Sequence, residues 1–146
     1  DDTDDDDFTL LQCAVQGGSV DLVKYLIEKG ADDEDFETQE GYDSLIKAVI
    51  NGHLPMIKYL AKYHSVDMEE ACEESGLCPL LHACSEGHIG IVRYLINKLG
   101  IDEDAKDNDE WTALHYACMG GHLDIVRFLI EQCDFDPEET ETDDWT

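Results

Sequence analysis

Glycines at nearly constant spacing constrain this chain more than any other feature. Four of them stand 34, 35 and 34 residues apart, at Gly18, Gly52, Gly87 and Gly121. Three are followed by His, and the first is followed by Ser19. Apolar residues at the three- and four-residue spacing of amphipathic helices run both before and after each glycine. This period indicates a supersecondary unit that is copied along the chain, because one such unit cannot bury its apolar face alone.

Each copy is predicted to contain two helices joined by a tight turn. The runs before the glycines read LLQCAVQG, SLIKAVIN, PLLHACSE and ALHYACMG. The runs after them read SVDLVKYLIEKG, HLPMIKYLAKYH, HIGIVRYLINKLG and HLDIVRFLIEQC. An alanine recurs where two backbones would approach closely, at Ala14, Ala48, Ala83 and Ala117. Acidic segments separate the copies, so the order is helix, turn, helix and acidic finger.

The chain resembles the ankyrin repeat family in the residues that fill this pattern. The fourth copy, WTALHYACMGGHLDIVRFLIE, is the nearest to the family pattern, and the first follows it from Thr9 to Asp32. The column of the family's Thr reads Thr9, Asp43, Cys78 and Thr112, and the column of its His reads Gln12, Ile46, Leu81 and His115. The third copy has one extra residue in NKLGID. We expect these departures to loosen individual turns.

The resemblance implies an all-α ankyrin-repeat solenoid of stacked helix-turn-helix units with β-turn or hairpin fingers. We expect a single ankyrin-repeat domain over 1–146, with repeats at 4–37, 38–72, 73–106 and 107–140 and the start of a truncated fifth at 141–146. Neither terminal repeat shows the polar outer face that a capping repeat needs. We therefore expect a fragment of a longer array. The alternative is a complete module that self-associates by stacking its uncapped terminal repeats on copies of itself.

The charge balance excludes several classes of partner. Nine Lys and Arg against 36 Asp and Glu give a net charge of −27. This argues against nucleic acid and against anionic membrane surfaces, because both attract basic proteins. No apolar run approaches the length of a membrane-spanning helix. The six cysteines, several of them inside apolar helical runs, predict reduced thiols in an intracellular, cytoplasmic protein.

One row of residues is the strongest candidate for a binding surface. Proteins of the ankyrin family usually bind through their fingers and the exposed face of the first helix of each repeat. The residue before the Thr column is Phe8, Tyr42, Leu77, Trp111 and Trp145. Ile50 and Met119 would add apolar area on the first helices. Exposed aromatic residues are typical of binding hot spots; the alternative is that they pack locally and stiffen the fingers.

The predicted function is protein–protein recognition through the concave face and the acidic fingers. The predicted contacts are Tyr42, Leu77, Trp111, Ile50, Met119, Glu40, Glu74 and Asp109. Carboxylates around an aromatic row would attract a basic, partly apolar partner by electrostatic steering. The alternative interpretation of the charge is a solvated excess that keeps the array soluble. The alternative function is a structural scaffold or spacer segment of a larger array, or an engineered ankyrin-repeat protein.

No pattern of catalytic or metal-binding residues stands out. Cys84 and His88 are four residues apart, as are Cys118 and His122, but a glycine ends the helix inside each pair. We interpret these cysteines as small core residues and the histidines as hydrogen-bonding residues of the turns. The acidic segments do not fit an EF-hand loop, and weak divalent-cation binding at the fingers stays open. We therefore expect no enzyme, no cofactor and no dedicated metal site.

A column of basic residues recurs in the second helix of each repeat. It consists of Lys24, Lys58, Arg93 and Arg127. Exposed ion pairs on such a helix contribute little to stability. We interpret this column as mostly a solubilising helix face.

Overall fold

The computed structural model describes residues 9–32, 39–64, 68 and 76–133. The chain divides into two compact units, Asp1–Cys72 and Glu73–Thr146. The described residues of both units are helical apart from their turns and isolated β-bridge residues such as Lys106 and Thr112, so the all-α prediction is confirmed. Among these residues, no helix has the length and apolar character needed to cross a lipid bilayer.

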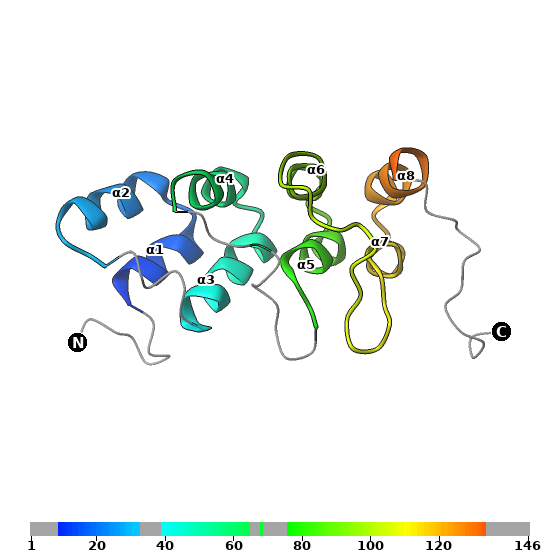
Figure 1. The fold of residues 1–146 in the computed structure, drawn as a ribbon, viewed down its shortest axis with the longest axis horizontal. Coiled ribbons are helices and arrows are strands. Elements are labelled where there is room, and N and C mark those ends of the chain that lie inside the picture. Colours follow the sequence, from blue (N-terminus) through cyan, green and yellow to red (C-terminus); the bar gives the residue numbers. More distant parts are fainter. Residues whose placement is uncertain (1–8, 33–38, 65–67, 69–75, 134–146) are drawn as a thin grey trace. The chain divides into compact units, whose positions relative to one another are not determined.

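The first unit contains two helix pairs. They are α1 (Leu10–Gly17) with α2 (Val20–Glu28), and α3 (Gln39–Ile50) with α4 (Leu54–Tyr63). The first helices α1 and α3 pack on each other, and the second helices α2 and α4 do the same (Figure 1). Leu11, Val15, Leu45 and Ile57 are fully buried in this unit. The predicted stacking of one helix pair on the next is therefore present here.

The ends of α1 follow directly from its sequence. The Thr9 side chain accepts a hydrogen bond from the Gln12 N–H at 3.2 Å, and the Gln12 side chain accepts one from the Thr9 N–H at 3.0 Å. This reciprocal capping box satisfies backbone donors that a helix start leaves unpaired. Gly18 then ends the helix in the left-handed conformation, with φ of 76°, which glycine adopts without steric cost. Thr112 and His115 form the same box before α7 (Ala113–Gly120).

The second unit repeats the arrangement. It contains α5 (Pro79–Glu86), α6 (Ile89–Arg93), the π-helical segment η2 (Tyr94–Lys98), α7, and α8 (Leu123–Gln132). Here α5 packs on α7 and α6 packs on α8. The finger that leads into α7 is closed by an antiparallel bridge between Lys106 and Thr112, as predicted for a hairpin finger. The segments 1–8, 33–38, 69–75 and 134–146 hold most of the other predicted finger residues and lie outside the described residues.

One helix starts earlier than the sequence predicts. In the repeat pattern, Tyr42 precedes the helix and belongs to the finger, but α3 begins at Gln39 and includes Tyr42. The other first helices have a sharp start signal, which is a capping box before α1 and α7 and a proline at the start of α5. The second repeat has Asp43 in the column of the capping threonine, but Ile46 stands where Gln12 and His115 return the hydrogen bond. The reciprocal box cannot form there, and the helix extends toward the N-terminus.

The extra residue of the third repeat is accommodated within the second helix. In η2, the Leu99 N–H bonds the Tyr94 carbonyl five residues back, at 3.1 Å. At the equivalent place in the first repeat, the Lys29 N–H bonds the Tyr25 carbonyl four residues back, at 3.0 Å. One residue is therefore inserted as a single wide π-turn. We expected the extra residue to loosen this turn. The last turn of the helix is wider than in the first repeat, but it keeps its hydrogen bond.

The histidines of the Gly-His turns connect neighbouring repeats. His122 Nε2 lies 2.9 Å from the Ser85 carbonyl oxygen of the preceding repeat. A methyl group built on Gly87 would lie 2.6 Å from the His122 ring, and one on Gly18 would lie 2.5 Å from the His53 ring. His122, predicted as a hydrogen-bonding residue of its turn, does form a hydrogen bond, but its partner lies across the repeat boundary and its ring packs on the glycine of the previous turn.

The basic column also contributes to stacking within each unit. The Lys24 ammonium lies 5.6 Å from the centre of the Tyr59 ring, and the Arg93 guanidinium lies 5.8 Å from the centre of the Phe128 ring. Both are within the range of cation–π attraction. In each case, a cation of one repeat covers an aromatic ring of the next. The interpretation of this column as a solubilising face is therefore incomplete for Lys24 and Arg93.

Candidate protein-binding site

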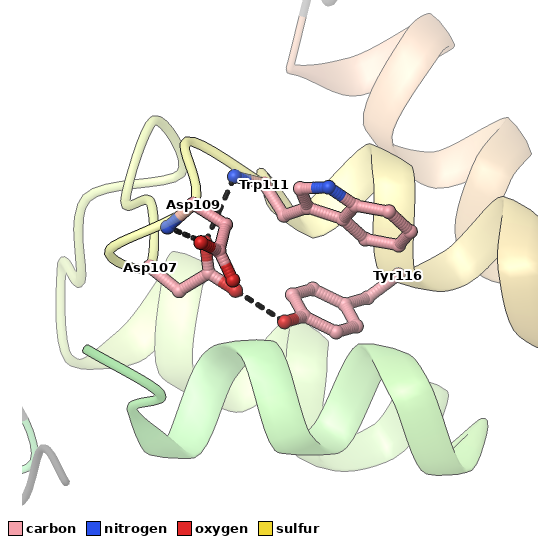
Figure 2. Close-up of a pocket in the computed structure, with 4 residues that line it drawn as sticks. All are labelled: Asp107, Asp109, Trp111 and Tyr116. Atoms are coloured by element: carbon pink, nitrogen blue, oxygen red, sulfur yellow. Dashed lines mark hydrogen bonds between the residues drawn. The ribbon is translucent and has the colours of Figure 1, made fainter. Parts of the chain in front are cut away.

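An open hollow at the base of the described finger is a candidate site. Asp107, Asp109, Trp111 and Tyr116 line it. The first three belong to the finger, and Tyr116 comes from the first turns of α7. Figure 2 shows the indole and phenol rings on one side of the hollow and the two carboxylates on the other. The hollow therefore combines aromatic and anionic walls.

Asp107 organises the finger. Its Oδ1 accepts hydrogen bonds from the N–H groups of Asp109 and Trp111, both at 2.9 Å. Its Oδ2 accepts a hydrogen bond from the Tyr116 hydroxyl (Figure 2), and its own N–H donates to the Trp111 carbonyl at 3.1 Å. This carboxylate ties the finger both to itself and to α7, so its role is to hold the hollow in shape.

The ionisation of the hollow follows from these contacts. Burial opposes ionisation of Asp107, but the hydrogen bonds from Tyr116, Trp111 and Asp109 outweigh burial and hold the pKa of this carboxyl below its ordinary value. Burial and the hydrogen bond to Asp107 raise the pKa of Tyr116 to about 12. At neutral pH, Asp107 is therefore an anion and Tyr116 a neutral donor, which is the combination that favours their hydrogen bond.

The tip of the finger has two further constraints. Lys106 and Glu110 form an ion pair with an N–O distance of 3.4 Å. Glu110 adopts a left-handed backbone with φ of 67°, which residues other than glycine adopt uncommonly. The ion pair uses the Glu110 carboxylate, whereas the neighbouring Asp109 side chain is exposed.

Trp111 packs locally and is still partly open to solvent. Its ring centre lies 5.3 Å from that of Tyr116 and 5.6 Å from that of His115. His115 Nδ1 accepts a hydrogen bond from the Thr112 N–H at 3.1 Å, so the histidine of the family's His column bonds the turn that starts its own helix. The indole is half-buried. Trp111 therefore packs against its own repeat and also leaves part of its ring accessible to solvent.

The structure brings together two of the residues predicted to bind a partner. Trp111 and Asp109 line the same hollow. In the same unit, Leu77 is half-buried just before α5, and Met119 is exposed near the end of α7. Tyr42 and Ile50 are half-buried on α3 in the other unit.

Two predicted residues have side chains that the structure does not describe, and two residues that line the hollow were not predicted. Glu40 lies in α3, but its side chain is outside the description, and Glu74 lies outside the described residues. Sequence reasoning missed Asp107 and Tyr116. Asp107 could have been found as the first residue of a turn in which an aspartate side chain bonds the backbone two residues on. Nothing in the sequence connects it to Tyr116.

The cysteines of the described residues are thiols rather than disulfides. They are Cys13, Cys78, Cys84, Cys118 and Cys133. Burial, together with the nearby Cys78 and Cys133, raises the pKa of the Cys84 thiol, so this residue behaves as a small core side chain. Over the ranges that the structure describes, no group of three or more His, Cys, Asp or Glu residues could hold a metal ion.

Comparison with known proteins identifies the family. The family model for ankyrin repeats in three copies matches residues 1–70 and 65–141. No curated protein matches the chain. Among solved structures, the chain is similar to one in the crystal structure of the yeast ribosomal protein Rps3 in complex with its chaperone Yar1. The TM-score is 0.74 at 18% identity, over 88% of this chain and 94% of that chain, which is a likeness of fold. The family model spans nearly the whole sequence, and the chain therefore belongs to the ankyrin repeat family.

Proposed function

We propose that this chain is a protein–protein interaction module that binds a basic, partly apolar segment of a partner protein. Ankyrin repeats are generally non-enzymatic interaction modules. The observation that carries the proposal is the hollow in which the aromatic faces of Trp111 and Tyr116 lie beside the exposed carboxylate of Asp109. The solved structure with the same fold contains a chaperone bound to a ribosomal protein, and by analogy we propose a protein partner for this chain.

The chemistry of the hollow suits a lysine or arginine side chain. A cation placed over an indole or phenol ring is attracted by the ring and gains about 0.5–2 kcal/mol, more when water is excluded. The Asp109 carboxylate can pair with the same cation. Asp107 already accepts three hydrogen bonds, so in this proposal it positions the aromatic wall and adds to the negative field. The aliphatic stem of the lysine or arginine packs on the rings.

The remaining charge strengthens approach of the partner. A net charge of −27 raises the local concentration of basic partners and speeds their association, and salt weakens this effect. We keep Tyr42, Leu77, Ile50 and Met119 as proposed apolar contacts, with Glu40 and Glu74 as proposed sources of charge. An intracellular location is part of the proposal, supported by the five thiols among the described residues.

Binding of defined peptides tests the proposal. The probe is a synthetic peptide in which lysine or arginine alternates with leucine, and its control carries glutamate at the basic positions. We expect only the basic peptide to bind, with an affinity that falls as salt rises. Asp109→Asn should weaken binding, whereas Glu131→Gln, which removes an equal charge from an exposed position on α8, should have a smaller effect. Equal binding of both peptides, or equal effects of both variants, contradicts the proposal.

The contacts of Trp111 with Tyr116 and His115 favour a second candidate function, a structural scaffold or spacer. In that case, Trp111→Ala lowers stability but no peptide binding depends on it. If the chain is a recognition module, Trp111→Ala abolishes peptide binding while circular dichroism still reports the folded helices.

A further inference from the structure

We propose that the outward face of α1 and α2 binds the outward face of α7 and α8 of a second copy, in a head-to-tail contact. This proposal is independent of the finger hollow. It rests on a comparison of equivalent residues in the first and last repeats and on the contacts that join the helix pairs inside each unit.

The face of α1 and α2 exposes residues that later repeats bury. Leu22 is 46% exposed and Tyr25 is 55% exposed. Their equivalents in the fourth repeat, Ile125 and Phe128, are 0% and 2% exposed. Leu10 is likewise exposed, where its equivalent in α7, the smaller Ala113, is buried. In the fourth repeat, the preceding helix pair covers these positions. The first repeat exposes the same positions as an apolar face.

The face of α7 and α8 shows the complementary difference. Cys118 is exposed and Val126 is half-buried, whereas their equivalents in the third repeat, Cys84 and Val92, are both 0% exposed. A methyl group on Gly121 would meet nothing within 4 Å, whereas one on Gly87 would strike the ring of His122. In the third repeat, the following helix pair covers these positions. The fourth repeat leaves the same positions open.

The contacts inside each unit show what fits these two faces. Lys24 of α2 covers Tyr59 of α4, and Arg93 of α6 covers Phe128 of α8. The next basic residue of this column, Arg127, is exposed on α8, and the first aromatic ring of the series, Tyr25, is 55% exposed on α2. Lys29, four residues after Tyr25, lies 5.6 Å from its ring centre, at the place where Tyr63 contacts Tyr59 in the next repeat. A second copy brings Arg127 over Tyr25 in the same relation. The matching cation and ring are the reason to assign the face to another copy of this chain.

The contact joins different surfaces of the two copies, so it is heterologous and extends to longer assemblies. Two properties limit its strength. Each copy carries −27, so repulsion opposes association and added salt strengthens it. Inside the chain, the ring of His122 packs on Gly87. In the proposed contact, Ser19 of the second copy stands at the place of that histidine and faces Gly121, so the contact between ring and glycine is missing.

Sedimentation equilibrium of the full chain over a range of concentrations tests the proposal at low and high salt. We expect the average mass to rise with concentration beyond that of a dimer, more strongly at high salt. Leu22→Asp blocks one face and Arg127→Glu blocks the other. Each should weaken association at least about tenfold, so that each variant is monomeric at the concentrations where the wild type begins to associate. Both residues are exposed in the single chain, and circular dichroism checks that the variants are folded. The matched controls, Tyr63→Asp and Lys98→Glu, change exposed residues elsewhere and should associate like the wild type.

Mixing the two blocked variants gives the sharpest result. Each variant alone should be monomeric, and the mixture should form a one-to-one dimer and nothing larger, because one intact face of each kind remains. A wild-type chain that stays monomeric at every concentration and salt overturns the proposal, and so does a mixture that stays monomeric. Dimers that persist in either single variant, or a wild type that stops at the dimer, also overturn it. Binding of the basic peptide by Leu22→Asp should be unchanged, so the two proposals fail separately.

Discussion

The sharpest test of the repeat interface is a methyl group added at Gly87. This glycine ends α5 with φ of 83°, and a methyl group built on it would lie 2.6 Å from two atoms of the His122 ring. Gly121 is its equivalent one repeat later, with φ of 73° and no atom within 4 Å of the added methyl. Gly87→Ala and Gly121→Ala therefore share one backbone cost and differ in one contact.

The magnitudes follow from these two contributions. Alanine in the left-handed region costs about 1–2 kcal/mol at either position. At Gly87, the clash forces the imidazole away, and overpacking of this kind costs about a further 1–3 kcal/mol. That value includes loss of the hydrogen bond between His122 and the Ser85 carbonyl. We expect Gly121→Ala to lower the free energy of unfolding by about 1–2 kcal/mol and Gly87→Ala by about 2–5 kcal/mol.

Urea denaturation of four chains measures the difference: the wild type, Gly87→Ala, His122→Ala and the double variant. Removal of the ring should relieve the clash, so the double variant should lose less stability than the sum of the two single variants, by about 1–3 kcal/mol. The measurements belong at low protein concentration, where copies do not associate. Equal losses for Gly87→Ala and Gly121→Ala, together with strict additivity in the cycle, would refute the role of His122 as the residue that packs between repeats.

Three further predictions follow from the charges and thiols. The Tyr116 phenol should ionise near pH 12 in the folded chain and closer to 10 in Asp107→Asn, as measured by phenolate absorbance against Tyr116→Phe. Because this pKa is raised on folding, the stability it contributes is complete below about pH 10 and is lost as the pH rises toward 12; an unchanged titration in Asp107→Asn contradicts the assigned hydrogen bond. Iodoacetamide should modify the exposed Cys118 much faster than the buried Cys84, and mass spectrometry of peptides would show equal rates if the burial is wrong. Added salt should raise the melting temperature, because it screens the −27 charge; a melting temperature that is constant from low to high salt contradicts this.

Much of the fold could be predicted because the repeat places strong local signals at fixed positions. Gly18 and Gly121 end their helices where the spacing says they should, and Thr9 and Thr112 start theirs with a capping box. The start of α3 was not predicted, because Asp43 occupies the capping column but Ile46 cannot return the hydrogen bond that completes the box, and the helix continues to Gln39. The wide turn at η2 was equally hidden, since the sequence shows one extra residue but not which hydrogen bonds accommodate it.

The site was less predictable because it depends on contacts between repeats and between distant residues. Trp111 and Asp109 were found from the column before the helix, but Asp107 matters through a hydrogen bond to Tyr116, nine residues further along the chain. The basic and aromatic columns were both visible as adjacent residues in each second helix. Only the offset between stacked helices shows that Lys24 covers Tyr59 of the next repeat, and no single repeat contains that information.

The wide turn of η2 has a consequence for how this chain keeps its stacking when a helix gains a residue. Leu95 is fully buried just after the point where the hydrogen bonds change their span, and Ile101 is buried beyond it. The added residue therefore leaves the apolar residues on both sides in the positions that face their neighbours. In an ordinary helix, one inserted residue rotates every later side chain by more than a quarter turn. Here the effect of the insertion is limited to the one wide turn. The interval from Gly87 to Gly121 that contains η2 is still 34 residues long, like that from Gly18 to Gly52. The extra helical residue is therefore balanced by a finger that is one residue shorter, and the next helix pair begins at the same place in the repeat.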